Sequence, residues 1–371
     1  MMVQPIPAAK PIIGKEEREA VDRVMQSGML AQGPEVAAFE QEFGAALVSG
    51  RACVATNSGT SGLHLGLLAA GVGPGDEVIV PSFTFAATAN SVALTGATPV
   101  FVDIEPTYFC LDPAAVEAAI TEKTKAVMPV HLFGHPANVT ALQAIADKHS
   151  ADKPAERRIH IYEDAAQAHG ATWNGAPVGT FGEFAMFSLY PTKNMTSGEG
   201  GMNSVANADL ERRMRLFRNQ GMLKQYENEV VGLNNRMTDL HAAIGRVQLT
   251  KVGGWTKQRQ ENAAFLDANL QGVAVPAVAA EATHVYHQYT IRVTEDRDGF
   301  ANALRTEYGV GCGVYYPIPN HRLPSFQREL DLPETEKAAA EVLSLPVHPS
   351  LSEDDLNRIV AAVNTVAKAG A

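Results

Sequence analysis

One lysine, Lys193, stands among small and polar residues in the stretch SLYPTKNMTSGEGG, directly after the apolar run EFAMFSLY. The apolar run predicts a buried strand. An unpaired ammonium loses several kcal/mol of hydration free energy when it enters a protein interior, so a lysine at this position needs a compensating role. The pattern indicates either an ion-pair partner or a nucleophile.

Two further polar residues, Asp164 and Gln167, follow the strand-like run at the start of IHIYEDAAQAHG. In α/β proteins, ligands bind beyond the carboxyl ends of the strands, so a carboxylate placed there is a candidate for a site. Taken alone, Asp164 is explained equally well by a structural ion pair or a helix cap.

The segment TNSGTSGLHL runs from an expected strand into an expected helix. The backbone N–H groups of Gly59, Thr60 and Ser61 then lie at the positive end of a helix, which suits a phosphate. An ordinary strand-to-helix turn explains the segment as well. It matches neither a Walker A motif nor GxGxxG, so neither a nucleoside triphosphate nor a dinucleotide is indicated.

Phe85, in PSFTFAATAN, follows another expected strand and has the shape to cover a flat ring, although a phenylalanine in such a run is more often part of the core. Together these features indicate an anion site, an aromatic platform, a carboxylate and an amine. Pyridoxal 5′-phosphate (PLP) presents the complementary groups: a phosphate, a flat ring, a pyridine nitrogen and an aldehyde.

The elements that must position these residues alternate along the first two thirds of the chain. Strands that are apolar on nearly every residue and are joined by helices predict an α/β fold with a mainly parallel sheet covered on both faces. Asp112 before Pro113 is an expected N-cap, with proline at the first helical position. The strand-like runs are ACVAT, EVIVPS, TPVFVDI, KAVMPVHL, IHIYEDA and FAMFSLY.

After TDLHAAIGRVQLTKV the pattern changes to a smaller α+β arrangement. Its expected elements are a helix near 254–270, the strand VYHQYTIRV, a helix near 298–308 and a last helix from Ser352, where SEDD resembles a capping box. We therefore expect a large domain over 1–250 and a small one over 251–371. The charged stretch 150–158 is expected at the surface.

Composition narrows the function classes. With 46% apolar residues in 371, the chain can bury a full core. A net charge of −11 without a dense basic cluster argues against nucleic acid as a partner. Three dispersed cysteines, Cys53, Cys110 and Cys312, and the lack of an export signal indicate a reducing cytoplasm. The uncharged stretch 78–102 is interrupted by Pro and Gly and predicts strand, helix, strand, not a membrane span.

Two other chemistries are not indicated. His131 and His135 in HLFGHP are four apart, but Gly134 and Pro136 disfavour a helix, and no third ligand has suitable spacing, so we expect no metal site. Ser188 and Lys193 are five apart and do not form the SxxK pair, and the chain has no GxSxG motif.

Four stretches together carry a specific resemblance over about residues 10–350. They are similar to the DegT/DnrJ/EryC1/StrS family of PLP-dependent sugar aminotransferases, of fold type I. The stretches are TNSGTSGLHLGLLAAGVGPGDEVIVPSFTFAATANSVALTGATPVFVDIE, EDAAQAHGA, GTFGEFAMFSLYPTKNMTSGEGGM and GLNNRMTDLHAAIGRVQL. The last departs from the family's more frequent pattern, which has tyrosine at the position of Asn235.

The resemblance implies a role for each candidate. Lys193 matches the lysine that binds the cofactor as an imine, Asp164 the partner of the pyridine nitrogen, Gln167 the group near the 3-hydroxyl, and Phe85 the stacking aromatic. Gly59, Thr60, Ser61 and Ser188 match phosphate contacts. Asn234 matches an asparagine that reaches the phosphate from the neighbouring subunit, which implies a homodimer with shared active sites.

The expected reaction moves an amino group from an amino acid, L-glutamate, to a nucleotide-linked keto-sugar in a ping-pong cycle. Tyr316, His321 and Arg236 are candidate substrate contacts, and packing roles explain them about as well. A keto-cyclitol acceptor with glutamine as donor, a PLP-dependent sugar dehydratase and a regulatory protein without turnover are the alternatives. One branch of the family has histidine in place of the lysine and dehydrates sugars, so Lys193 favours transamination.

Overall fold

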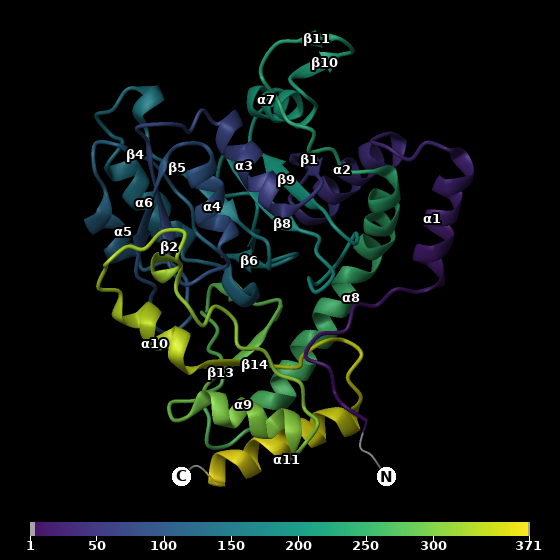
Figure 1. Cartoon of the computed structure of the whole chain (residues 1–371), viewed down its shortest axis with the longest axis vertical. Coiled ribbons are helices and arrows are strands. Elements are labelled where there is room, and N and C mark those ends of the chain that lie inside the picture. The colour runs from purple at the N-terminus through teal and green to yellow at the C-terminus, as the bar shows by residue number, and fades with distance from the viewer. Residues whose placement is uncertain (1–3, 370–371) are drawn as a thin grey trace.

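The computed structural model describes residues 4–369. Within them, a seven-stranded sheet in the order β1-β9-β8-β5-β4-β2-β3 forms the centre of the larger part of the molecule (Figure 1). Its strands are β1 (Ala52–Thr56), β2 (Glu77–Pro81), β3 (Thr98–Val102), β4 (Thr124–Val127), β5 (His160–Asp164), β8 (Phe184–Ser188) and β9 (Gly201–Val205).

The strand β9 was not among the expected elements. It lies between β1 and β8 and runs antiparallel to both, whereas the pairs from β8 to β3 are parallel. Its sequence, GMNSV, contains Gly and Asn, which are depleted in strands, yet every residue of it is buried. Burial between two neighbouring strands therefore overrides a weak local preference.

Helices cover both faces of the sheet, which confirms the predicted α/β fold. Alternate side chains of a strand point to opposite faces. In β8, Met186 packs in one buried cluster with Leu63, whereas Phe187 packs in another with Phe39. The helices of this part are α2 (Pro34–Leu47), α3 (Gly59–Ala69), α4 (Ala87–Leu94), α5 (Pro113–Ala119), α6 (Val139–Lys148) and α7 (Ala208–Arg218).

The second part of the molecule lies at the other end of the long helix α8 (Asp239–Asn269), in the lower half of Figure 1. It contains β13 (Tyr289–Arg292), α9 (Arg297–Thr306), α10 (Pro333–Glu341), β14 (Val342–Leu345) and α11 (Glu353–Ala369). The strand β14 was not expected and pairs antiparallel with β13. Both helices expected after residue 290 are present.

The predicted division at residue 250 falls inside α8, which continues without a break. The chain also returns to this part at its start: Ile6 is buried in the cluster that holds Leu266 and Leu345, and its N–H donates to Gly309 O (2.9 Å). The division into 1–250 and 251–371 stays a prediction. The helix expected near 254 begins earlier, at Asp239, because Thr238 caps it.

Several local expectations are confirmed. Residues 78–102 form β2, α4 and β3, and within the described residues no helix is long and apolar enough to cross a membrane. The Asp112 side chain accepts from Ala114 N (3.0 Å), and the Ser352 hydroxyl accepts from Asp355 N (3.1 Å), so both caps are formed.

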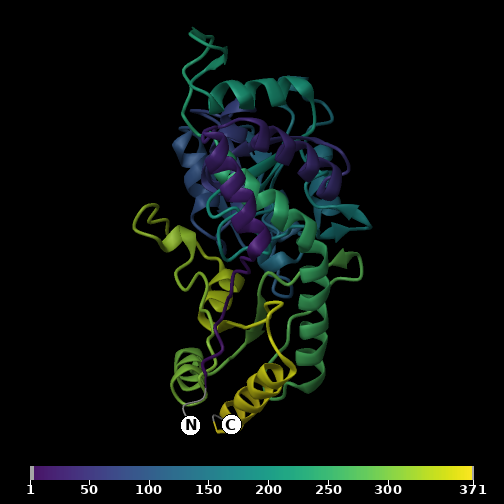
Figure 2. The same cartoon turned by 90° about the vertical axis from the view of Figure 1, so that its right-hand side faces the viewer.

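The remaining short elements lie away from the main sheet. A helix α1 (Lys15–Ser27) packs against α8. A hairpin of β10 (Met222–Lys224) and β11 (Glu227–Asn228) projects beyond α7, as Figures 1 and 2 both show. A small sheet joins β6 (Thr172–Trp173), β7 (Ala176–Pro177) and β12 (Ala282–Thr283).

Candidate active site

A cavity of about 530 Å³ lies at the sheet edge where the parallel strands end. Most of its lining comes from the ends of β5 and β8 and from segments that follow β1, β2, β4, β5 and β8, the positions at which open α/β sheets bind ligands. The rest comes from residues 287–288 and 315–316. The volume suits a small-molecule site. The predicted residues that line it are Gly59, Thr60, Phe85, Asp164, Gln167, Ser188, Lys193 and Tyr316.

Lys193 lies in the loop between β8 and β9. Its backbone N–H donates to Tyr190 O (3.0 Å), and the side chain of the next residue, Asn194, donates to Val285 O (2.9 Å). These two hydrogen bonds fix the position of the loop. Burial lowers the pKa of the Lys193 amine to about 8, against the opposing effect of the Asp164 carboxylate. A substantial fraction of this amine is therefore neutral, and hence nucleophilic, at weakly basic pH.

Asp164 is the last residue of β5, is buried and lines the cavity. Its Oδ2 accepts from Thr88 Oγ1 (2.8 Å) and its Oδ1 accepts from Ala166 N (3.1 Å). Burial raises the pKa of this carboxyl, while the two hydrogen bonds and the nearby Lys193 act against that rise. The carboxylate is thus held in one orientation beside a basic group.

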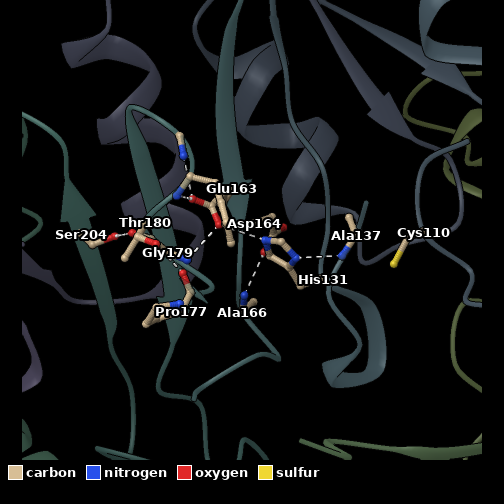
Figure 3. A network of polar contacts seen from close by, with 12 residues as sticks. Cys110, His131, Ala137, Glu163, Asp164, Ala166, Pro177, Gly179, Thr180 and Ser204 are labelled. Carbon is tan, nitrogen blue, oxygen red and sulfur yellow. Dashed lines mark hydrogen bonds and ion pairs between the residues drawn. The ribbon is translucent and has the colours of Figure 1, made fainter. Parts of the chain in front are cut away.

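The preceding residue, Glu163, is fully buried in a polar network that Figure 3 shows from close by. Its Oε2 accepts from His131 Nε2 (3.2 Å), since His131 Nδ1 is occupied as the acceptor of Ala137 N (3.0 Å). Burial raises the pKa of Glu163, but its donors outweigh that effect and leave it below its usual value. Its other donors, at 2.8 to 2.9 Å, are the N–H groups of Gly179, Phe181 and Gly182.

The same network fixes the end of β5, because His131 N donates to Asp164 O (3.0 Å) and Asp164 N donates to Pro129 O (2.9 Å). Both nitrogens of His131 have protein partners, and His135 Nε2 accepts from Ala279 N (3.1 Å). Among residues 4–369, no three His, Cys, Asp or Glu side chains group together in a way that could hold a metal ion.

The N-terminus of α3 borders the cavity through Gly59 and Thr60, and further glycines allow the helix to lie directly on β8. A Cβ on Gly62 would come within 2.9 Å of Met186, and one on Gly66 within 2.5 Å of the Phe184 ring. The helix N-terminus carries partial positive charge, which suits an anion. Ser61 is not part of the lining: its N–H donates to the capping Ser58 Oγ (3.1 Å).

Phe85 is 63% exposed although its neighbour Phe83 is fully buried. The interpretation of Phe85 as a core residue is therefore wrong, and its ring borders the cavity. A large aromatic surface facing a cavity offers a platform for a flat ligand.

Gln167 is buried and both ends of its amide are engaged. Its Oε1 accepts from Phe133 N (2.6 Å), and its Nε2 donates to Tyr316 Oη (2.8 Å). Tyr316 belongs to the C-terminal part of the chain, so this hydrogen bond joins segments far apart in sequence at the cavity wall.

Besides Ser61, three further predicted residues lie outside the cavity lining. His321 is fully buried and contacts Ser82 Oγ (2.7 Å) and Glu336 Oε1 (3.1 Å), which supports the packing alternative. Arg236 Nη1 donates to Asn219 Oδ1 (2.6 Å). Asn234 is exposed and forms an antiparallel bridge with the same Asn219.

The cavity also contains residues that the sequence did not single out. Its lining includes Glu199, His287 and Tyr315, while Thr88 lies behind the lining and contacts Asp164. Burial, and then the charge of Lys193, lower the pKa of His287 well below its usual value, which keeps the imidazole neutral. Glu199 lies in the stretch SGEGG, close after Lys193, so the sequence could have identified it. His287 reaches the site only through the tertiary fold.

The groups present fit PLP. A ring placed against Phe85 would have the helix N-terminus of Gly59 and Thr60 for its phosphate, Asp164 for its pyridine nitrogen and the Lys193 amine for its aldehyde. The fold and the site thus indicate the class of the protein: an α/β enzyme whose groups at the end of the sheet fit PLP.

Comparison with known proteins narrows this class. The model of the DegT/DnrJ/EryC1/StrS aminotransferase family matches residues 11–364, so the chain belongs to that family, which is PLP-dependent. Two relatives are a transaminase named for dTDP-3-amino-3,4,6-trideoxy-α-D-glucose from Streptomyces venezuelae (40% identity, covering 94% of this chain and 91% of the relative) and a pleiotropic regulatory protein from Geobacillus stearothermophilus (42%, 94% and 93%).

Solved structures agree with this assignment. The S. venezuelae enzyme DesV in complex with a ketimine intermediate superposes with a TM-score of 0.90 at 38% identity, covering 98% of this chain and 99% of DesV. The PLP form of a sugar aminotransferase from Streptococcus pneumoniae, described as putative, has a TM-score of 0.93 at 29% identity, covering 99% and 100%. The chain is a PLP-dependent aminotransferase of this family.

Proposed function

We propose that this enzyme transfers the amino group of L-glutamate to a keto-sugar linked to a nucleotide, dTDP or UDP, in a ping-pong cycle. The observation that carries the proposal is the Lys193 amine, whose pKa is lowered to about 8, in a cavity that also holds Asp164. The names of relatives that act on dTDP- and UDP-linked sugars support the substrate class.

The roles of the side chains follow from their positions. PLP supplies an electron sink for the carbanion that forms at the substrate carbon. Asp164 would hold the pyridine nitrogen protonated, Phe85 would cover one ring face, and Gln167 would donate to the 3-hydroxyl. Gly59, Thr60 and Ser188 would bind the phosphate. Lys193 would attach the cofactor covalently and, once released, carry a proton at its Nζ.

We also propose that two copies share each site. Among the described residues that line the cavity, Lys193 is the only lysine or arginine, whereas the cofactor phosphate, the donor carboxylate and the sugar diphosphate are all anionic. A second copy would supply further polar groups, beginning with the exposed Asn234. Mixing Lys193→Ala with Asn234→Ala tests this: activity above the mean of the two pure variants supports sharing, and activity at the mean contradicts it.

The alternatives predict different products. A dehydratase releases no aminated sugar, and a cyclitol enzyme prefers a keto-cyclitol and glutamine. A regulatory protein, as one relative is named, shows no turnover. The cytoplasmic location stays a prediction.

The test is a screen of keto-sugar nucleotides with the PLP-loaded enzyme and L-glutamate, with products identified by mass spectrometry. The expected result is an aminated nucleotide sugar together with 2-oxoglutarate, and no product from Lys193→Ala. Full turnover by Lys193→Ala, or no aminated product from any keto-sugar nucleotide, would overturn the proposal.

A further inference from the structure

The Gln167 side chain is hydrogen-bonded to two residues, Phe133 and Tyr316, that both have an unusual backbone conformation. Phe133 has φ 57° and Tyr316 has φ 59°, in the left-handed region that bulky residues rarely adopt. Their rings lie nearly parallel, at an interplanar angle of 15° with centroids 6.2 Å apart. Strained backbone persists where the surroundings over-determine it and clusters at functional sites, so the convergence of both residues on Gln167 calls for a functional explanation.

The orientation of the Gln167 amide is determined by its partners. A backbone N–H only donates, so the amide atom facing Phe133 N must be Oε1 (2.6 Å). The Nε2 group therefore faces Tyr316, whose hydroxyl oxygen accepts one of its two hydrogens (2.8 Å). The second hydrogen of Nε2 remains for a ligand, because both side chains line the cavity.

We propose that Tyr316 is a positioning residue of the cofactor site, which acts through Gln167 by holding its amide so that one N–H is offered to the 3-oxygen of PLP. This inference rests on the proposed placement of Gln167 beside the cofactor. Tyr316 also brings the C-terminal part of the chain into contact with a residue that follows β5. Burial raises the pKa of the Tyr316 hydroxyl, so it stays protonated and does not act as a base.

A double-mutant cycle tests the inference. Tyr316→Phe keeps the ring and removes only the acceptor, so the PLP dissociation constant of the apoenzyme should rise by about three- to tenfold, the range of one ordinary hydrogen bond. In the Gln167→Ala background the same change should have no further effect, because residues that act through one another are non-additive. Fluorescence titration with PLP measures both values.

A spectroscopic readout separates positioning from packing. Loss of a donor to the 3-oxygen leaves more negative charge on it, so the pH midpoint of the visible band of the PLP-loaded enzyme should move upward in Tyr316→Phe. Tyr162→Phe, which removes a buried hydroxyl in the core away from the cavity, should change neither the dissociation constant nor the midpoint.

The inference would be overturned if Tyr316→Phe changed the PLP dissociation constant equally in both backgrounds, or did not change it in the wild-type background. In either case, PLP binding by the wild type would leave the proposed function standing. If Tyr316→Phe lowers the thermal unfolding midpoint and leaves the spectral midpoint unchanged, its role is structural and the inference is wrong. A wild-type enzyme that binds no PLP overturns both proposals.

Discussion

The hydroxyl of Thr88 donates a hydrogen bond of 2.8 Å to Asp164 Oδ2, so the first turn of α4 supports the carboxylate at the end of β5. A hydrogen bond to the charged form of a carboxyl favours ionisation and opposes the burial that raises the pKa of Asp164. Thr88 is itself fully buried, which leaves its hydroxyl few other partners. The contact therefore helps to keep Asp164 anionic for its proposed partner, the pyridine nitrogen.

Replacement of Thr88 by valine should raise the pKa of Asp164 further and weaken PLP binding. Valine preserves the shape and removes the donor, and one hydrogen bond to a charged group contributes roughly 1.5–3 kcal/mol. We expect the PLP dissociation constant of Thr88→Val to rise by at least tenfold, as measured by titration of the apoenzyme. Thr88→Ser keeps the hydroxyl and should stay within about threefold of wild type; equal losses in both variants would contradict the role of this hydrogen bond.

Phe85 and Phe83 make a matched pair, because they are two residues apart and differ in burial. Phe83 is fully buried, so Phe83→Ala should reduce the free energy of unfolding by about 3–5 kcal/mol. Phe85 is 63% exposed, so Phe85→Ala should leave unfolding nearly unchanged and weaken PLP binding by about 0.5–1.5 kcal/mol. Urea unfolding and PLP titration of both variants check the contrast, and a Phe85→Ala protein that binds PLP normally would exclude the stacking role.

The sequence predicted the groups of the site that follow a recognisable strand. Asp164 and Lys193 stand after apolar runs, so the rule for parallel sheets placed both at one edge. Ser61, predicted as a phosphate contact, donates its N–H to Ser58, which matches the ordinary strand-to-helix turn that the sequence left as an alternative. His287 reaches the site only through packing between distant segments, whereas Thr88 stands near Phe85 in the sequence and its role is revealed only by its contact with Asp164. The strand β9 contains too few strand-forming residues to be predicted without its neighbours.

Glu163 should contribute to folding, not to binding. Its buried carboxylate accepts from His131 and three backbone N–H groups, and Glu163→Gln places an NH₂ group against these donors. We expect a loss of about 3–5 kcal/mol in the free energy of unfolding at pH 7. Because the folded pKa of Glu163 is lowered, the difference from wild type should shrink as pH falls below the ordinary value of 4.5.

The control for this change is Glu183→Gln, directly before β8, the neighbour of β5 in the sheet. Glu183 is half-buried and its carboxylate faces His160 at 3.6 Å, a geometry that contributes about 0–1 kcal/mol. Urea unfolding of both variants from pH 8 down to well below pH 4.5 provides the comparison, in the absence of ligand. Equal, small losses for Glu163→Gln and Glu183→Gln would show that the network in Figure 3 does not stabilise the fold.

Lys193 should destabilise the apoenzyme, since its folded pKa of about 8 lies below the ordinary 10.5. Below pH 8 the amine is charged in both the folded and the unfolded state, and the folded state bears the full penalty of burying that charge. Between pH 8 and 10.5 the folded state releases its proton first, so the stability of wild type rises with pH in this window.

Lys193→Met removes the charge and keeps the length of the side chain. The variant should therefore be more stable than wild type by roughly 1–3 kcal/mol at pH 7, and this advantage should vanish as pH approaches 10.5. Urea unfolding of both apoproteins across this range measures the difference, and a constant difference at all pH values would mean that the Lys193 amine is not desolvated.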